Sequence, residues 1–140
     1  MTVALSPETR APKQPLQPSG WLRYFSFSVD HKVIGLQYLV CGFAFYLVGG
    51  ALAGAIRTEL LSPVSDFMPR DVYNQVLTLH GTVMIFLWIV PVVNGAFGNY
   101  LIPFYVGARD MAFPRLNAVA FWLIPPAGLM LIASYFLTGA

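Results

Sequence analysis

Charge is scarce in this sequence. Only 10% of the 140 residues are Asp, Glu, Lys or Arg, whereas soluble domains carry about a quarter, and the mean hydropathy is +0.66. Cysteine is nearly absent too: Cys41 is the single one, so the chain forms no internal disulfide. These shortages exclude an ordinary soluble domain and a disulfide scaffold. The net charge is +2, and we expect no nucleic acid partner.

The first 20 residues lack an apolar core of signal-peptide length. Their sequence, MTVALSPETRAPKQPLQPSG, is polar and proline-rich, which predicts a disordered tail. It contains no Arg-rich, Ser-rich transit segment, and this favours the inner (plasma) membrane of a bacterium over an organelle membrane.

What the chain does have is three long charge-free runs: Val33 to Ile56, Val72 to Ala108 and Leu116 to Ala140. A bilayer core needs about 20 helical residues, so the runs predict transmembrane helices over 33–57, 71–102 and 116–138. The second helix is expected to end near Pro103, where GNYLIPFYVG supplies helix breakers. GALAG in the first run is a GxxxG match and predicts a helix-packing groove. The fold class is therefore all-α, a polytopic membrane helical bundle.

The basic residues predict the orientation of the helices. Six lie before the first span or between the second and third, and two lie between the first and second. The positive-inside rule then predicts a cytoplasmic N-terminus. The six are Arg10, Lys13, Arg23, Lys32, Arg109 and Arg115, and the two are Arg57 and Arg70.

His80 heads the apolar stretch TLHGTVMIFLWIVP. If the second helix begins at Asp71, His80 lies roughly 13 Å along its axis at 1.5 Å per residue. An ionisable side chain at this depth needs a partner and indicates function. From the residues alone the partner is open: a metal, a haem iron, a proton path of a transporter, or a backbone carbonyl in a purely structural role. Gly81 beside it leaves room for a flat macrocycle.

Several strings together resemble the N-terminal part of subunit I of cytochrome c oxidase, in the haem-copper oxidase family. They are DHKVIGLQYL, AIRTEL, TLHGTVMIF, GAFGNYLIPFYVGARDMAFPRLN and FWLIPPAG, within residues 21–140. The resemblance implies that these residues belong to a larger bundle of about twelve helices. It also implies that His80 is one of two axial ligands of a low-spin haem, haem A rather than haem B, whose second ligand lies outside this chain.

The same resemblance assigns three residues near the outer surface. Arg57 matches an arginine that hydrogen-bonds a haem substituent and tunes the haem's reduction potential, and Tyr73 matches a tyrosine near that haem. Glu59 matches a carboxylate of a calcium or sodium site, although the following loop, LLSPVSDFMPRD, departs from the family.

A second group belongs to proton uptake. Asp110 matches the carboxylate at the mouth of a proton-uptake route, and Asn99 and Asn117 match asparagines that order water inside it. From the residues alone, Asp110 would be a loop carboxylate paired with Arg109 or Arg115.

The complete family enzyme passes electrons from cytochrome c through the low-spin haem to a high-spin haem and a copper ion, reduces dioxygen to water and pumps protons. The resemblance implies a copper-bearing subunit II and a subunit III as partners. The ligands of the dinuclear centre belong to later helices, so we expect this chain to be inactive alone, and its end at SYFLTGA suggests a truncated sequence.

Besides a transporter that would use His80 as a proton relay, two alternatives to this interpretation remain. A quinol oxidase is one, but the expected quinone-site positions are Val48, Leu52 and Val72, and only Gln75 agrees. The other is a non-enzymatic three-helix membrane module.

Overall fold

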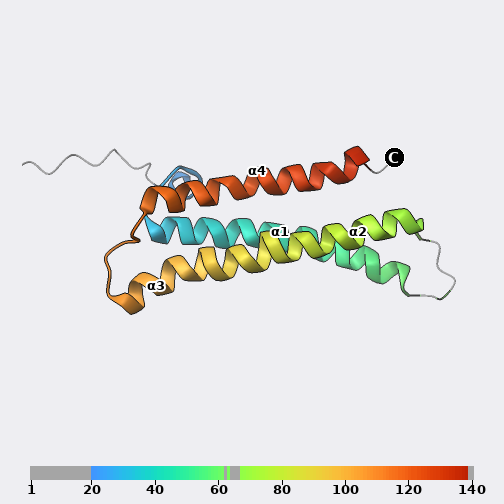
Figure 1. Ribbon diagram of the computed structural model, residues 1–140, viewed down its shortest axis with the longest axis horizontal. Helices are drawn as coiled ribbons and strands as arrows, with labels where there is room; N and C mark the ends of the chain where they lie inside the picture. The colour runs from blue at the N-terminus through green and yellow to red at the C-terminus, as the bar shows by residue number, and fades with distance from the viewer. Residues whose placement is uncertain (1–19, 62, 64–66, 139–140) are drawn as a thin grey trace, which may run out of the picture.

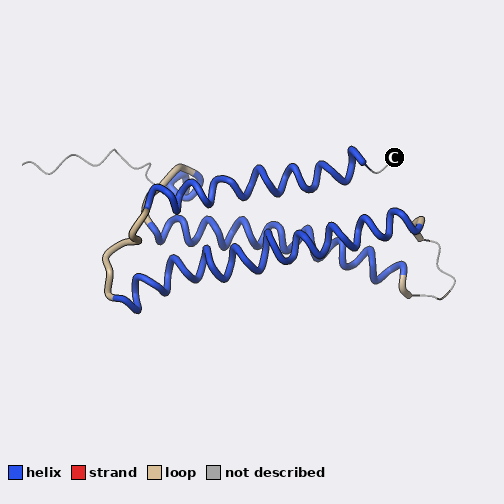
Figure 2. The backbone as a smooth tube through the Cα atoms, in the orientation of Figure 1, coloured by secondary structure: helices blue, strands red, loops and turns tan. Residues whose placement is uncertain are grey.

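Three long helices run side by side in the part of the chain that the computed structural model describes, residues 20–61, 63 and 67–138. They are α1 (His31–Glu59), a continuous second helix from Arg70 to Val106, and α4 (Pro114–Thr138). Each is long and apolar enough to cross a membrane. Figure 1 shows the second helix crossing α1, with α4 alongside, and the described residues in Figure 2 are helix and loop. The predicted all-α membrane bundle is confirmed. The tail expected over 1–20 lies outside the described residues, apart from Gly20.

The second helix changes its winding around a proline. It begins as α2 (Arg70–Thr82), continues through the π-helical segments η2 (Val83–Ile89) and η3 (Pro91–Phe97), and ends as α3 (Gly98–Val106). Pro91 has no N–H to donate, and its ring crowds the carbonyl four residues earlier. A π turn, which bonds i to i+5, relieves that crowding without breaking the helix.

The ends of the helices differ from the expected bounds for local reasons. The second helix does not end near Pro103, as predicted, but continues to Val106. The breaker is Gly107, in the left-handed conformation with φ 70°. The N–H groups of Gly107 and Ala108 donate to the carbonyls of Phe104 and Pro103 at 3.3 and 3.0 Å, which caps the last turn.

At the same end of the bundle, α1 begins earlier than expected, at His31. The Asp30 carboxylate accepts a hydrogen bond from the Lys32 N–H at 2.9 Å and caps α1. It also pairs with Arg23, at 2.8 Å, on the short helix η1 (Gly20–Phe25). Gln37 donates to the carbonyls of Tyr24 and Ser26, each at 2.9 Å. These bonds hold η1 against the start of α1.

Glycines let α1 approach the second helix closely, but not the glycines of the GxxxG match. Gly35, Gly42 and Gly49 recur every seven residues, and a Cβ built on them lies 2.8, 2.8 and 2.5 Å from Tyr100, Val92 and Met84. A Cβ on Gly50 or Gly54 meets no described atom within 4 Å. Among the described residues these two glycines pack against no other helix, so the prediction that GALAG forms a packing groove stays a prediction.

The core between the helices consists of two apolar clusters. One lies toward the start of α1 and includes Ile34, Tyr38 and Phe121, and the other, farther along, includes Phe45 and Val83. The α4 helix is held close because Gly128 lies directly on the Phe45 ring. Most large apolar side chains outside these clusters are exposed, as expected of helices whose surroundings are lipid or other membrane helices.

Candidate functional site

His80 is held by a bond from one helix to another. Its Nδ1 lies 2.9 Å from the carbonyl oxygen of Gly49 on α1. A carbonyl only accepts, so Nδ1 carries the hydrogen and Nε2 is the nitrogen with a free lone pair. This arrangement is the one in which metal-ligating histidines are oriented, with the far nitrogen left for the metal. The side chain is only partly buried, so Nε2 is not sealed in the core.

Gly49 makes this bond possible. Its backbone is buried against η2, and any Cβ there would lie 2.5 Å from the Met84 sulfur, closer than real Cβ atoms approach. The absent side chain brings the α1 carbonyl within reach of the imidazole. Sequence reasoning assigned no role to Gly49, because its partner lies 31 residues away in the chain.

Beside His80 the backbone is bare. Gly81 follows it directly, and a Cβ built on Gly81, Gly50 or Gly54 has no neighbour within 4 Å among the described residues. Gly50, Gly54 and Arg57 follow one another at i, i+4 and i+7, which places them along one face of α1. A free imidazole nitrogen, a surface without side chains and a cation at its end fit a flat, anionic macrocycle such as haem.

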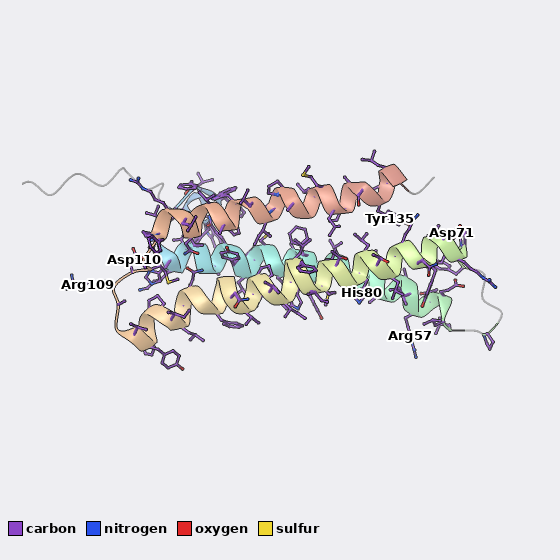
Figure 3. The ribbon with its side chains drawn as sticks, in the orientation of Figure 1. Arg57, Asp71, His80, Arg109, Asp110 and Tyr135 are labelled. Atoms are coloured by element: carbon purple, nitrogen blue, oxygen red, sulfur yellow. The ribbon has the colours of Figure 1, made fainter. Side chains whose placement is uncertain are left out.

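Arg57 and Tyr73 lie at the same end of the bundle as His80. Figure 3 shows Arg57 and His80 toward the end that carries Asp71, with Arg109 and Asp110 at the opposite end. Arg57 is exposed, Tyr73 is partly buried, and neither side chain has a recorded polar partner within the described residues. Their positions leave both groups available to a ligand.

Glu59, the expected cation ligand, is engaged by the backbone. Its Oε2 accepts a hydrogen bond from the Met68 N–H at 2.9 Å, which ties the end of α1 to the segment before α2. The described residues contain no cluster of three or more His, Cys, Asp or Glu side chains that would hold a metal ion. Part of the loop between α1 and α2, residues 62 and 64–66, lies outside the described residues.

At the opposite end Asp110 pairs with a histidine. Its Oδ1 lies 3.0 Å from Nδ1 of His31 and also accepts the Met111 N–H at 2.8 Å. The His31 side chain is 11% exposed and that of Asp110 is 49% exposed, so the carboxylate is the part of the pair that water reaches. The alternative from the residues alone, a pairing with Arg109 or Arg115, was wrong, because the side chain that Asp110 contacts among the described residues is His31.

Sequence reasoning did not single out His31. The signal was its position: it is one of two histidines in the chain and stands directly before the first charge-free run. A buried histidine at a helix start needs a polar partner, and the loop between the second and third spans carries the carboxylate that fits.

Asn99 and Asn117 form a reciprocal amide pair. Nδ2 of Asn99 lies 3.4 Å from Oδ1 of Asn117, and Nδ2 of Asn117 donates to Oδ1 of Asn99. Asn99 also donates to the Gly95 carbonyl and is 2% exposed. The pair joins α3 to α4 at the end of the bundle where Asp110 lies. The structure thus brings Asn99 and Asn117 into contact, and it joins Asp110 to His31 rather than directly to either asparagine.

Comparison with known proteins gives a consistent result. A family model described as "Cytochrome C and Quinol oxidase polypeptide I" matches residues 33–140. Cytochrome c oxidase subunit 1 of Thermostichus vulcanus is 63% identical over 120 residues, which cover 86% of this chain and 22% of the relative. The subunit 1 of Synechocystis sp. is 64% identical over 116 residues, covering 83% and 21%. That of Bacillus sp. PS3 is 50% identical over 113 residues, covering 81% and 18%. The chain therefore spans about a fifth of the length of these relatives.

Proposed function

This chain belongs to the cytochrome c and quinol oxidase polypeptide I family, and on that premise we propose that His80 is an axial ligand of a low-spin haem in a terminal respiratory oxidase. The hydrogen bond from His80 Nδ1 to the Gly49 carbonyl carries the proposal. It fixes the tautomer, aims Nε2 away from α1 and raises the basicity of the ring, as the outer bond of a metal-bound histidine does. When bound, the haem, which we take to be haem A, accepts and passes on one electron at a time.

Arg57 and Tyr73 border the proposed haem. The glycine face of α1 leads to Arg57, whose guanidinium would donate a charge-assisted hydrogen bond to a polar substituent of the haem. In a low-dielectric site a fixed cation favours the state with one more electron. Arg57 therefore raises the reduction potential of the haem. Tyr73 lies two helical turns from His80 along α2 and borders the proposed haem on the same side of that helix as His80.

The other end of the bundle takes up protons. Asp110 receives them from water, because its carboxylate is half exposed while its His31 partner is buried. His31 holds the carboxylate at the start of α1 and keeps it pointed at the bundle. The Asn99–Asn117 pair lies farther in, where amide groups that both donate and accept order water for proton transfer.

The whole oxidase extends beyond this chain. We infer that later helices supply the second haem ligand, the high-spin haem and the copper ion at which dioxygen is reduced to water, while protons are pumped. Electrons arrive from cytochrome c through a copper-bearing subunit II, and subunit III completes the complex. The N-terminus lies in the cytoplasm of a bacterium whose inner membrane holds the oxidase, as the basic residues predict. Glu59 keeps one carboxylate oxygen for a calcium or sodium site, because only Oε2 accepts the Met68 N–H.

The reduced-minus-oxidised visible spectrum tests the central assignment. In the assembled full-length oxidase, His80→Asn abolishes the low-spin haem band, because an amide does not supply the strong-field nitrogen that imidazole does. His31→Asn is the matched control: it removes the other histidine, at the far end of the bundle, and leaves the band in place. A normal low-spin band in an assembled His80→Asn enzyme contradicts the assignment.

A further inference from the structure

An apolar cavity lies between η1, α1 and α4, at the end of the bundle that carries Asp110. It measures about 880 Å³. Figure 1 shows η1, in blue, against the starts of α1 and α4. Two of the lining side chains, Val40 and Trp122, are 55% and 38% exposed, so the cavity opens to the surroundings of the bundle. Its walls on α1 and α4 are mainly apolar and include Leu36, Val40, Cys41, Ala44, Trp122 and Pro125.

The third wall is η1, which side-chain hydrogen bonds hold in place. Gln37 on α1 donates to the carbonyls of Tyr24 and Ser26, each at 2.9 Å. Trp21 and Tyr24 line the cavity, and both are exposed. Tryptophan and tyrosine gather at the level of the lipid headgroups in membrane proteins. The mouth of the cavity is therefore at headgroup level.

From this level the cavity extends into the membrane span. Its lining on α1 reaches from Leu36 to Ala44, a distance of roughly 12 Å along the helix at 1.5 Å per residue. Ala44 lies 13 positions beyond His31, the first residue of α1. An acyl chain that runs parallel to the helices fits walls of this chemistry, because it offers them van der Waals contact and carries no polar group to leave unpaired.

Cations continue two of the walls toward the surface. Lys32 lies one turn before Leu36 on α1, and Arg115 lies two turns before Trp122 on α4, so each shares a face of its helix with a lining residue. Both cations are exposed. Neither forms an ion pair with any other described residue.

The carboxylates at this end of the bundle have other partners. Asp30 pairs with Arg23, itself a lining residue, at 2.8 Å, and Asp110 contacts His31 at 3.0 Å. Unpaired cations therefore stand beside the mouth of an apolar cavity. This arrangement complements a molecule with an anionic head and a hydrocarbon tail.

We propose that the cavity binds one acyl chain of an anionic phospholipid, whose phosphate lies beside Lys32 and Arg115. Each cation at a membrane surface favours an anionic lipid about fivefold, so the two together select it over a zwitterionic lipid by more than about tenfold. The site is separate from the proposed haem and proton functions, because its lining contains none of the residues assigned to either.

Photolabelling tests the site in the assembled full-length oxidase, reconstituted into phosphatidylcholine vesicles. The probe is a phosphatidylglycerol that carries a diazirine midway along one acyl chain. After illumination, the masses of peptide fragments should locate adducts at positions 36–44 or 121–125. Unlabelled phosphatidylglycerol should displace the probe from these positions at a concentration at least about tenfold lower than additional phosphatidylcholine does.

Charge variants test the headgroup contact. Arg115→Gln and Lys32→Gln should each weaken the displacement by phosphatidylglycerol about fivefold. Arg70→Gln is the matched control, because it removes an exposed cation at the opposite end of the bundle, and it should leave the displacement unchanged.

A volume variant tests the acyl chain. Ala44→Trp fills the inner end of the cavity and should abolish the adducts on α4. Leu39→Trp is the control, since it enlarges a side chain that is 38% exposed and lies outside the cavity. If Ala44→Trp fails to assemble, the competition and the charge variants still decide.

Three results would overturn the proposal. Equal displacement by both lipids, or charge variants that displace the probe like wild type, would mean that any lipid occupies the cavity. Labelling of other membrane-facing peptides with none at positions 36–44 or 121–125 would mean that another part of the oxidase covers it. Unchanged adducts on α4 in an assembled Ala44→Trp enzyme would mean that the chain lies outside the cavity.

Discussion

Gly49→Ala should displace His80, the proposed haem ligand, although it leaves His80 itself unchanged. In the structure an added Cβ lies 2.5 Å from the Met84 sulfur and 3.0 Å from Met84 Cγ, whereas non-bonded carbon atoms settle at about 3.5–4.0 Å. The deficit of about 1 Å must be met by moving Met84 or by separating α1 from the second helix. Separation lengthens the 2.9 Å bond from His80 to the Gly49 carbonyl.

The size of the effect follows from these distances. Moving the helices apart by about 0.5 Å takes the hydrogen bond beyond the roughly 3.2 Å limit of a good N–H···O contact. Overpacking costs about 1–3 kcal/mol, and leaving a partly buried donor unpaired adds about 1–3 kcal/mol. Met84 reduces this sum to the extent that its flexible thioether swings aside. We expect a destabilised enzyme with a shifted low-spin haem band and a changed haem potential.

The measurement combines thermal unfolding of the purified oxidase with the reduced-minus-oxidised spectrum. Gly98→Ala is the matched control, because a Cβ there meets ordinary contacts at 3.8 and 3.9 Å. The double variant Gly49→Ala, Met84→Ala removes the clashing sulfur and should recover both the band and most of the stability. If Gly49→Ala leaves the low-spin band and potential unchanged, Gly49 does not orient His80. If the double variant recovers nothing, the clash with Met84 is not the cause.

Three further predictions concern the ends of the bundle. Arg57→Met in the full-length oxidase should lower the potential of the low-spin haem, on the order of tens of millivolts, and shift its visible band; a redox titration that matches wild type removes the role. Asp110→Asn should slow turnover about tenfold or more and impair proton pumping while both haem spectra stay intact, and loss of haem would instead indicate a structural carboxylate. For topology, Phe67→Cys should be labelled from the outer face and Lys32→Cys only after permeabilisation; the opposite pattern reverses the assigned orientation.

Much of the fold was predictable because a membrane makes strong demands on composition. A charge-free run of about 20 residues has few alternatives to a spanning helix, and the three runs gave three helices. The ends were less certain. Pro103 and Gly107 are both helix breakers by composition, but only Gly107 adopts positive φ and caps the carbonyls. Which breaker acts depends on hydrogen bonds that the sequence alone does not display.

The candidate site was predictable only where a side chain carries its own chemistry. His80 and Asp110 stand out as ionisable groups in or beside apolar runs. Gly49 and His31 do not, because their importance comes from partners 31 and 79 residues away. Likewise GALAG matched a packing motif, yet the glycines that pack are spaced by seven residues. Contacts between distant segments decide these roles, and neither composition nor local spacing predicts them.

The π-helical segments of the second helix explain why its faces could not be assigned from the 3.6-residue period of an α-helix. His80 contacts α1, and Asn99, nineteen positions later, contacts α4. Between them lie two π-helical segments of seven residues each, on either side of Val90. Residues in a π-helix turn less around the axis than the 100° per residue of an α-helix. The angle around the helix axis between His80 and Asn99 is therefore set by how many of the residues between them are π-helical. Pro91 begins the second of these segments, and because it has no N–H to donate and its ring crowds the preceding turn, it favours the wider winding there.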